Sequence, residues 1–216
     1  MRYEDVLARL APVPAELPPL PRRLVPVLLP GPDGLMPAPD WPAQGEREAA
    51  VLLLIHPDAD GQARIVLTER TAGGHRHAGQ ISLPGGALEK SDASVAAGAL
   101  REAREEIGLD AEAEQVRVLG ELPAVEVRVS GFMVHPVVAA APAVPSLVAD
   151  PREVARILHA PLSAFLPDAP IQIVTEERDG FRLRYGAYPI GGHLVWGATA
   201  GILGRLGAFL SPAGSA

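Results

Sequence analysis

One helical segment flanked by strand-like runs places the tightest limits on how this chain can fold. Residues 93–107 show the most convincing helical pattern, with Asp92 positioned to cap the start and Gly108 positioned to end the helix. Short apolar runs typical of strands lie on both sides of it, at residues 49–55, 63–70, 80–83, 115–122, 125–129 and 132–140. Many strands with few helices between them predict a mixed α/β or α+β layered domain.

The two ends of the chain extend this outline. We expect a short amphipathic helix over residues 3–10, followed by a proline-rich stretch to residue 42 that is extended or looped, with one strand at 24–29. Towards the C-terminus we expect a helix at 152–159, a hairpin formed by 171–177 and 182–188, and a last helix within 195–210. The predicted organisation is a proline-rich N-terminal arm over residues 1–45, a compact domain over 46–210 and a tail over 211–216.

Charge and composition exclude several classes of function. The 216-residue chain carries a formal net charge of −7 and no cysteine. The negative charge argues against broad binding to nucleic acid or to an anionic membrane, although a small anionic substrate remains compatible with it. Without cysteine there is no disulfide, zinc–thiolate site or thiol nucleophile. The N-terminus lacks a signal-peptide pattern and the apolar runs are too short to span a bilayer, so we expect a cytoplasmic location.

The predicted helix over residues 93–107 carries an unusual number of carboxylates near its end. Glu102, Glu105 and Glu106 stand at i, i+3 and i+4 positions, which places them on neighbouring parts of one helix face. Like charges at this spacing repel by about 0.2–0.5 kcal/mol per pair, and the helix dipole disfavours anions there. A hard cation such as Mg²⁺, which prefers carboxylate oxygens, would reverse this repulsion. The alternative is a solvated face on which Arg101 pairs with Glu105.

The segment around these carboxylates resembles the Nudix box, whose pattern is G-x5-E-x7-R-E-U-x-E-E-x-G-U with U an aliphatic residue. Two glycines that allow close backbone approach, Gly85 and Gly86, precede the helix. The second half of the box fits at Arg101, Glu102, Ala103, Glu105, Glu106, Gly108 and Leu109. In the first half the acidic position falls on Asp92, with one residue more than usual before Arg101. Glu89 and Asp92 are therefore both candidates for that position.

A second segment is similar to the additional signature of coenzyme A pyrophosphatases within the Nudix family. That signature reads roughly L-L-T-x-R-S-x3-R-x3-G-x3-F-P-G-G, and the chain matches it at Leu67, Thr68, Arg70, Gly79 and Pro84-Gly85-Gly86. His75 stands in place of the second arginine, and Arg76 lies beside it. Further similarity at residues 130–138, 161–162 and 195–200 extends the resemblance over most of the chain from about residue 49 to 206.

The resemblance implies a Nudix α/β/α sandwich with a mixed β-sheet and a soluble enzyme that uses Mg²⁺ or Mn²⁺. The implied reaction is hydrolysis of coenzyme A to 4′-phosphopantetheine and adenosine 3′,5′-bisphosphate. Glu102 and Glu106 are the first choice for metal ligands, and Glu105 for a ligand or general base. Glu153 is a second candidate base. Arg101 is expected to support the loop and the carboxylates, and the backbone of Gly85 and Gly86 to contact the metal or the substrate. Arg70 and Arg76 are expected to contact a substrate phosphate.

Two other functions remain open from the sequence. One is a Nudix enzyme acting on another nucleoside diphosphate derivative, such as ADP-ribose or a dinucleotide. The other is a catalytically silent Nudix module that senses a nucleotide, although such a module is expected to have lost one of the three helix carboxylates. The proline-rich arm also leaves the oligomeric state open, including a homodimer in which the arm wraps a partner subunit.

Overall fold

A large mixed sheet forms the centre of the computed structural model, which describes residues 1–31, 34–36, 47–71, 79–178 and 181–211. Its central strand β2 (Arg47–Pro57) pairs in parallel with β8 (Phe132–Ala140) and antiparallel with β3 (Ala63–Arg70). The other strands extend the sheet on both sides: β4 (Ile81–Ser82) and β9 (Val154–Pro161) pair with β3, β5 (Gly85–Ala87) with β2, and β6 (Arg117–Glu121) and β7 (Val125–Val127) with β8.

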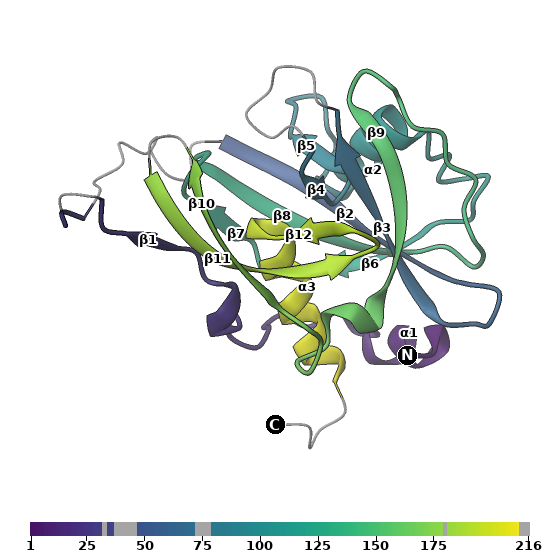
Figure 1. Cartoon of the computed structure of the whole chain (residues 1–216). Coiled ribbons are helices and arrows are strands. Elements are labelled where there is room, and N and C mark those ends of the chain that lie inside the picture. The colour runs from purple at the N-terminus through teal and green to yellow at the C-terminus, as the bar shows by residue number, and fades with distance from the viewer. Residues whose placement is uncertain (32–33, 37–46, 72–78, 179–180, 212–216) are drawn as a thin grey trace.

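A smaller sheet lies to one side of the large one (Figure 1). It contains β1 (Val27–Leu29), β11 (Phe181–Ile190) and β10 (Gln172–Arg178) in that order, with β12 (His193–Val195) paired to β11. The expected hairpin is therefore confirmed as β10 and β11. The strand expected at 24–29 is shorter and follows a 3₁₀ turn, η1 (Arg22–Leu24), while β12 was not predicted.

Two layers of apolar side chains cover the faces of the large sheet, because its strands are buried on both sides. The face formed by Leu52, Leu54 and Val66 packs against α2 (Val95–Ile107). The opposite face packs against α3 (Gly197–Leu210), the 3₁₀ helix η2 (Leu162–Phe165) and α1 (Tyr3–Arg9). Helices thus lie on both sides of a mixed sheet, which confirms the predicted α/β sandwich. In the described part of the chain, no helix combines the length and apolarity needed to cross a membrane.

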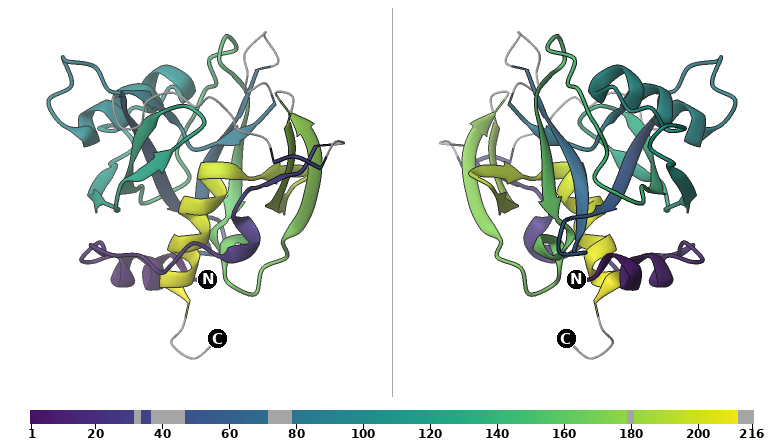
Figure 2. Two further views of the ribbon diagram at one scale, coloured as in Figure 1. Left: turned by 90° about the vertical axis from the view of Figure 1, so that its left-hand side faces the viewer. Right: turned by 90° about the vertical axis from the view of Figure 1, so that its right-hand side faces the viewer.

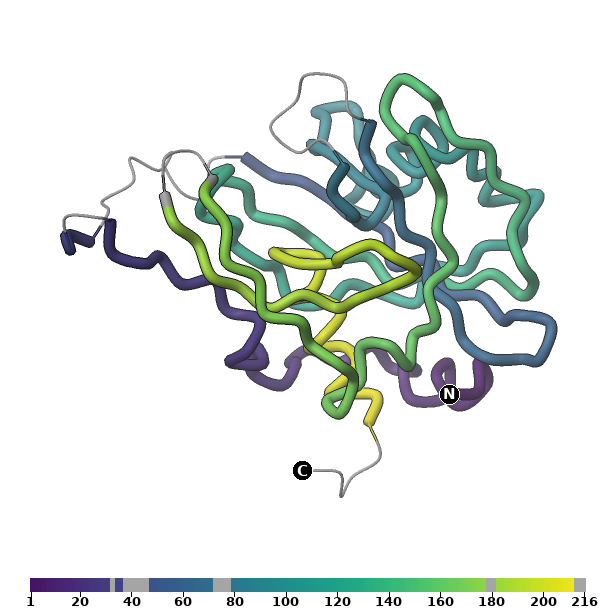
Figure 3. The backbone as a smooth tube through the Cα atoms, in the orientation of Figure 1, coloured from purple at the N-terminus to yellow at the C-terminus, as the bar shows by residue number. Residues whose placement is uncertain are grey.

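The N-terminal segment runs beside α3 on one side of the molecule, as Figures 2 and 3 show. Tyr3, Val6, Leu10 and Leu24 are buried in the same cluster as the side chains of α3. The Tyr3 hydroxyl donates a hydrogen bond of 2.8 Å to the backbone oxygen of Ala141. The first 24 residues therefore pack on the domain rather than extending away from it. The end of the predicted arm, residues 37–45, lies outside the described residues.

Two local predictions are wrong. Residues 152–159 were expected to be helical, but β9 pairs with β3 along its whole length, from Arg64 opposite Pro161 to Arg70 opposite Val154. Pairing in the sheet overrides the helical preference of this short segment. Asp92 was expected to cap α2, but the Ser94 side chain performs this role by accepting a hydrogen bond from the backbone N–H of Ala97.

Candidate active site

The C-terminal end of α2 is fixed by backbone contacts on two sides. Gly108 ends the helix with a φ of 63°, a left-handed conformation that favours glycine. The loop before β9 then returns to the helix, where the N–H of Asp150 donates to the carbonyl of Glu106 and the N–H of Val148 to that of Ile107. The part of α2 that carries the carboxylates is therefore held between the sheet and this loop.

Glu106 is the most deeply buried of the three helix carboxylates, with 4% of its side chain exposed. Its Oε2 accepts a hydrogen bond of 3.0 Å from the N–H of Gly85, and its Oε1 lies 3.8 Å from Nη2 of Arg70. Burial raises the pKa of Glu106 to about 7, and the nearby carboxylates of Glu102 and Glu153 add to the effect. The Gly85 hydrogen bond and Arg70 oppose it only in part.

Gly85 is the residue through which β5 reaches both Glu106 and the central strand. Its φ is +150°, which side-chain-bearing residues rarely adopt, and a Cβ atom there would lie 2.2 Å from the backbone oxygen of Ala50. At Gly86, a Cβ atom would lie 2.5 Å from Oε2 of Glu102. The two glycines therefore allow the backbone to touch the carboxylates of α2 directly, as their position before the helix suggested.

Glu102 is held against this loop by Arg101. Its Oε1 accepts a hydrogen bond of 2.9 Å from Nη1 of Arg101, and 16% of its side chain is exposed. Burial raises the pKa of Glu102, with Arg101 acting in the opposite direction. Glu105 differs, since 59% of its side chain is exposed and it lies 3.5 Å from Arg101. The expected i,i+4 contact between Arg101 and Glu105 is thus present, but the other two carboxylates are not on a solvated face.

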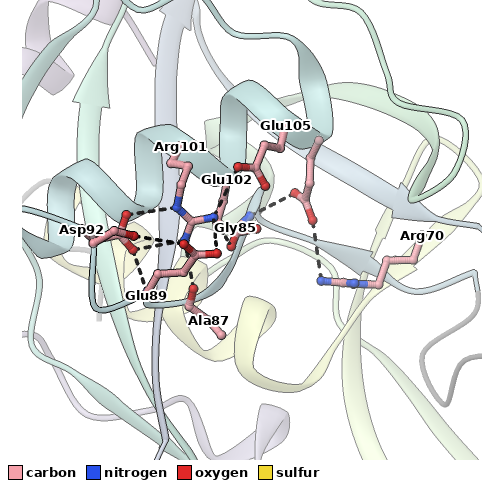
Figure 4. A network of polar contacts seen from close by, with 10 residues as sticks. Arg70, Gly85, Ala87, Glu89, Asp92, Arg101, Glu102 and Glu105 are labelled. Atoms are coloured by element: carbon pink, nitrogen blue, oxygen red, sulfur yellow. Dashed lines mark hydrogen bonds and ion pairs between the residues drawn. The ribbon is translucent and has the colours of Figure 1, made fainter.

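Arg101 connects the helix to the preceding loop through a network that Figure 4 shows. Its Nε and Nη2 donate to the two oxygens of Asp92 at 3.0 and 3.1 Å, and Nη2 also donates to the carbonyl of Ala87 at 3.0 Å. Glu89 lies farther away, at 4.0 Å. Hydrogen bonding to Arg101 lowers the pKa of Asp92 and raises that of Arg101. Of the two candidates for the first acidic position, Asp92 makes the close contact.

Glu153 approaches the same site from the turn before β9. Its backbone carbonyl accepts a hydrogen bond from the N–H of Thr71, the residue that follows β3. Its carboxylate contributes to the raised pKa values of both Glu102 and Glu106. The sequence signal for this position is misleading, because it predicts the first turn of a helix where the structure has a turn leading into β9. Arg76 lies outside the described residues.

The donor atoms at this site fit a hard divalent cation by their chemistry. Carboxylate oxygens of Glu102, Glu106 and Glu153 repel one another electrostatically, and a cation would remove that repulsion. Within the described ranges, however, no three His, Cys, Asp or Glu side chains already converge on one point. Glu102 and Glu105 are turned towards Arg101 instead.

Comparison with known proteins agrees with this geometry. The family model of the NUDIX domain matches residues 46–169, which is more than half of the chain. The chain belongs to the Nudix family. A Nudix hydrolase called NudL from Photorhabdus laumondii is 37% identical over 172 residues, covering 80% of this chain and 89% of its own. A second NudL, from Citrobacter koseri, is 40% identical over 160 residues, covering 74% and 81%.

Two further similarities are less extensive. A peroxisomal coenzyme A diphosphatase of Caenorhabditis elegans is 39% identical over 127 residues, covering 58% of this Nudix chain and 53% of its own length. Among solved structures, the Nudix hydrolase RenU of M. smegmatis is 25% identical over 64% of this chain and 81% of its own, with a TM-score of 0.47. Helix α2 and the Gly85–Gly86 loop correspond to the Nudix box predicted from the sequence.

Proposed function

We propose that this Nudix enzyme hydrolyses coenzyme A or a derivative to 4′-phosphopantetheine and adenosine 3′,5′-bisphosphate, using Mg²⁺ or Mn²⁺. The observation that carries the proposal is the buried Glu106 carboxylate, held between the Gly85 backbone and Arg70. Arg70 belongs to the segment that is similar to the coenzyme A signature, so that segment and the Nudix helix meet at one carboxylate. The similarity to a coenzyme A diphosphatase over 58% of the chain supports the same substrate.

Each residue has a proposed part in the reaction. Glu102 and Glu106, with the backbone carbonyl of Gly86, would hold a divalent ion. That ion would neutralise charge on the diphosphate and lower the pKa of water. Arg101 fixes the Glu102 carboxylate through its 2.9 Å hydrogen bond. Arg70, with 39% of its side chain exposed, is available to a substrate phosphate as well as to Glu106.

The general base is Glu105 or Glu153. Glu105 is 59% exposed, and Arg101 lies 3.5 Å from its carboxylate. Glu153 faces Glu102 and Glu106 closely enough to raise their pKa values, and it comes from an element outside the Nudix box. Substitution of each by glutamine separates them, because loss of the base lowers kcat by about 10²–10⁴-fold while substrate binding is kept.

The decisive experiment is incubation of the purified protein with coenzyme A, with added Mg²⁺ or Mn²⁺ and with a chelator, followed by mass spectrometry of the products. We expect both named products with metal and none with the chelator. Glu106→Gln should lose most turnover, whereas Glu112→Gln, at an exposed position beyond the helix, should not. If coenzyme A stays intact while ADP-ribose or a dinucleotide is cleaved, the substrate is that nucleotide and not coenzyme A. Nucleotide binding without turnover would indicate a sensing module.

A further inference from the structure

A second group of charged side chains lies at the same end of the large sheet, on the face opposite to α2. Glu69 follows Ile65 and Leu67 on the face of β3 that packs towards α3, whereas Arg70 reaches Glu106 on the α2 side. Arg156 stands directly opposite Glu69 on β9. His193 joins them from β12, a strand of the smaller sheet. Three separate elements therefore bring Glu69, Arg156 and His193 together next to the candidate active site.

The contacts within this group are long. Nε of Arg156 lies 3.6 Å from Oε2 of Glu69, Nη1 of Arg156 lies 3.5 Å from Nε2 of His193, and Nδ1 of His193 lies 3.9 Å from Oε1 of Glu69. Strong hydrogen bonds of a guanidinium to an anion are about 2.7–2.9 Å. Arg156 is also 62% exposed, although Glu69 and His193 are 22% and 18% exposed. Most of the five N–H donors of Arg156 have no close partner among the described residues.

We infer that Arg156 and His193 form a second anion site, which binds the ribose 3′-phosphate of the substrate. Arg70, which reaches the active site, and Glu69, which contacts Arg156 and His193, are consecutive residues. Their backbone positions on β3 are therefore about 3.3 Å apart along the strand. A nucleoside 3′,5′-bisphosphate carries its two phosphates on one ribose, and a sugar placed at the end of β3 would present one phosphate to each arginine. The inference rests on the proposed function, because coenzyme A carries this 3′-phosphate and ADP-ribose does not.

A binding experiment tests the site without relying on turnover. Adenosine 3′,5′-bisphosphate and adenosine 5′-monophosphate are titrated by calorimetry into the wild type, Arg156→Gln and the control Arg64→Gln. Arg64 lies on β3, at the end of the strand away from Glu69, where it pairs with Asp58 at 2.8 Å. We expect the wild type and Arg64→Gln to bind the bisphosphate at least tenfold more tightly than the monophosphate, a difference of about 1.4 kcal/mol. Arg156→Gln should lose that preference, and His193→Gln should reduce it. Equal binding of both ligands by the wild type, or a preference that survives Arg156→Gln, would overturn the inference.

Steady-state kinetics separate this inference from the proposed function. With coenzyme A, Arg156→Gln should raise KM about tenfold and leave kcat unchanged. With dephospho-coenzyme A, which lacks the 3′-phosphate, both constants should match those of the wild type. If Arg156→Gln changes KM by the same factor for both substrates, the inference of a second anion site is wrong, but the proposed hydrolysis of coenzyme A stands. A wild type that binds the bisphosphate through Arg156 yet cleaves neither substrate keeps the site and removes the proposed function.

Discussion

At the scale of single residues, Glu106 combines two properties that oppose each other in a metal-free protein. Its carboxylate is almost fully buried, and the cation nearest to it in the described structure, Arg70, is 3.8 Å away and partly exposed. A buried charge without a close partner is unfavourable, and this is why the pKa of Glu106 rises to about 7. Burial of the ionised Glu106 therefore lowers the free energy of unfolding of the metal-free protein, and a metal ion bound to this carboxylate would raise it again.

The stability of the metal-free protein should show this cost as a function of pH. Glu106 releases its proton near 4.5 in the unfolded chain and near 7 in the folded protein, so the folded state holds more protons between these values. Its contribution to stability therefore falls as pH rises from about 4.5 to 7 and stays low above that. At pH 8, Glu106→Gln should unfold at a higher denaturant concentration than the wild type. Its free energy of unfolding should be greater by on the order of 3 kcal/mol at most.

The control for this prediction is Glu105→Gln, since 59% of the Glu105 side chain is exposed. Chemical denaturation of the three proteins in a chelator, at pH 5 and pH 8, gives the comparison. The difference between wild type and Glu106→Gln should shrink at pH 5, and Mg²⁺ should stabilise only proteins that retain Glu106. A Glu106→Gln protein that is less stable than the wild type at pH 8 would contradict the assignment of the raised pKa to burial.

Asp92 is the residue through which the loop controls the position of Glu102. It accepts two hydrogen bonds from Arg101, which in turn donates to Glu102. We expect Asp92→Asn to weaken activation by the metal about 10–100-fold, because Arg101 and then Glu102 lose their fixed positions. Mn²⁺ titration of activity measures the effect. Glu89→Gln is the matched control, since Glu89 is 61% exposed and 4.0 Å from Arg101. Equal effects of the two substitutions would assign no special role to Asp92.

At the scale of secondary structure, the sequence predicted most elements but not every connection to the site. Strands β3 and β8 and the end of α2 have the predicted bounds, because a short apolar run and a terminating glycine are local signals. The segment that became β9 carries Ala, Arg, Leu and His, which are compatible with a helix, and only its pairing with β3 makes it a strand. The approach of Glu153 to Glu106 depends on that pairing, so no local pattern contained it.

Helix α3 packs through glycines whose importance the sequence did not indicate. At Gly207 a Cβ atom would lie 2.0 Å from the backbone oxygen of Phe165, and at Gly201 it would meet only the end of the Leu20 side chain at 3.3 Å. We expect Gly207→Ala to lower the free energy of unfolding by about 1–3 kcal/mol or more, since a backbone carbonyl cannot move aside. Gly201→Ala should be neutral or stabilising, because alanine favours a helix by up to about 1 kcal/mol. Thermal melts of both proteins decide whether this close packing exists.

At the scale of the whole molecule, the N-terminal segment and α3 stabilise each other at a distance from the candidate active site. Arg9 donates hydrogen bonds to the carbonyls of Leu210 and Ser211 at the end of α3, and Arg205 of α3 donates to the carbonyl of Pro18. Together with the buried side chains of α1, these contacts connect residues 187 to 202 positions apart. The proline-rich composition predicted the extended path of this segment but contained no information on what it contacts.

Removal of residues 1–25 should therefore prevent cooperative folding. Each of the buried side chains Tyr3, Val6, Leu10 and Leu24 contributes about 1.5–3 kcal/mol by leaving water, and their sum is comparable with the 5–15 kcal/mol that stabilises a typical domain. Circular dichroism and thermal unfolding of the truncated protein measure the outcome. A truncated chain that melts cooperatively near the wild-type temperature would show that the domain is independent of this segment.

Point variants in the full-length chain distinguish packing from a general effect of truncation. Leu10 is 1% exposed and Leu20 is 37% exposed, although both belong to the same segment. Leu10→Ala should cost about 2–5 kcal/mol, because it leaves a cavity between α1 and the core, whereas Leu20→Ala should cost much less. Because α1 contacts the sheet face opposite to α2, metal-dependent turnover by folded Leu10→Ala should stay at the wild-type level below its melting temperature. A loss of turnover in the folded variant would instead connect the N-terminal segment to the carboxylates of the site.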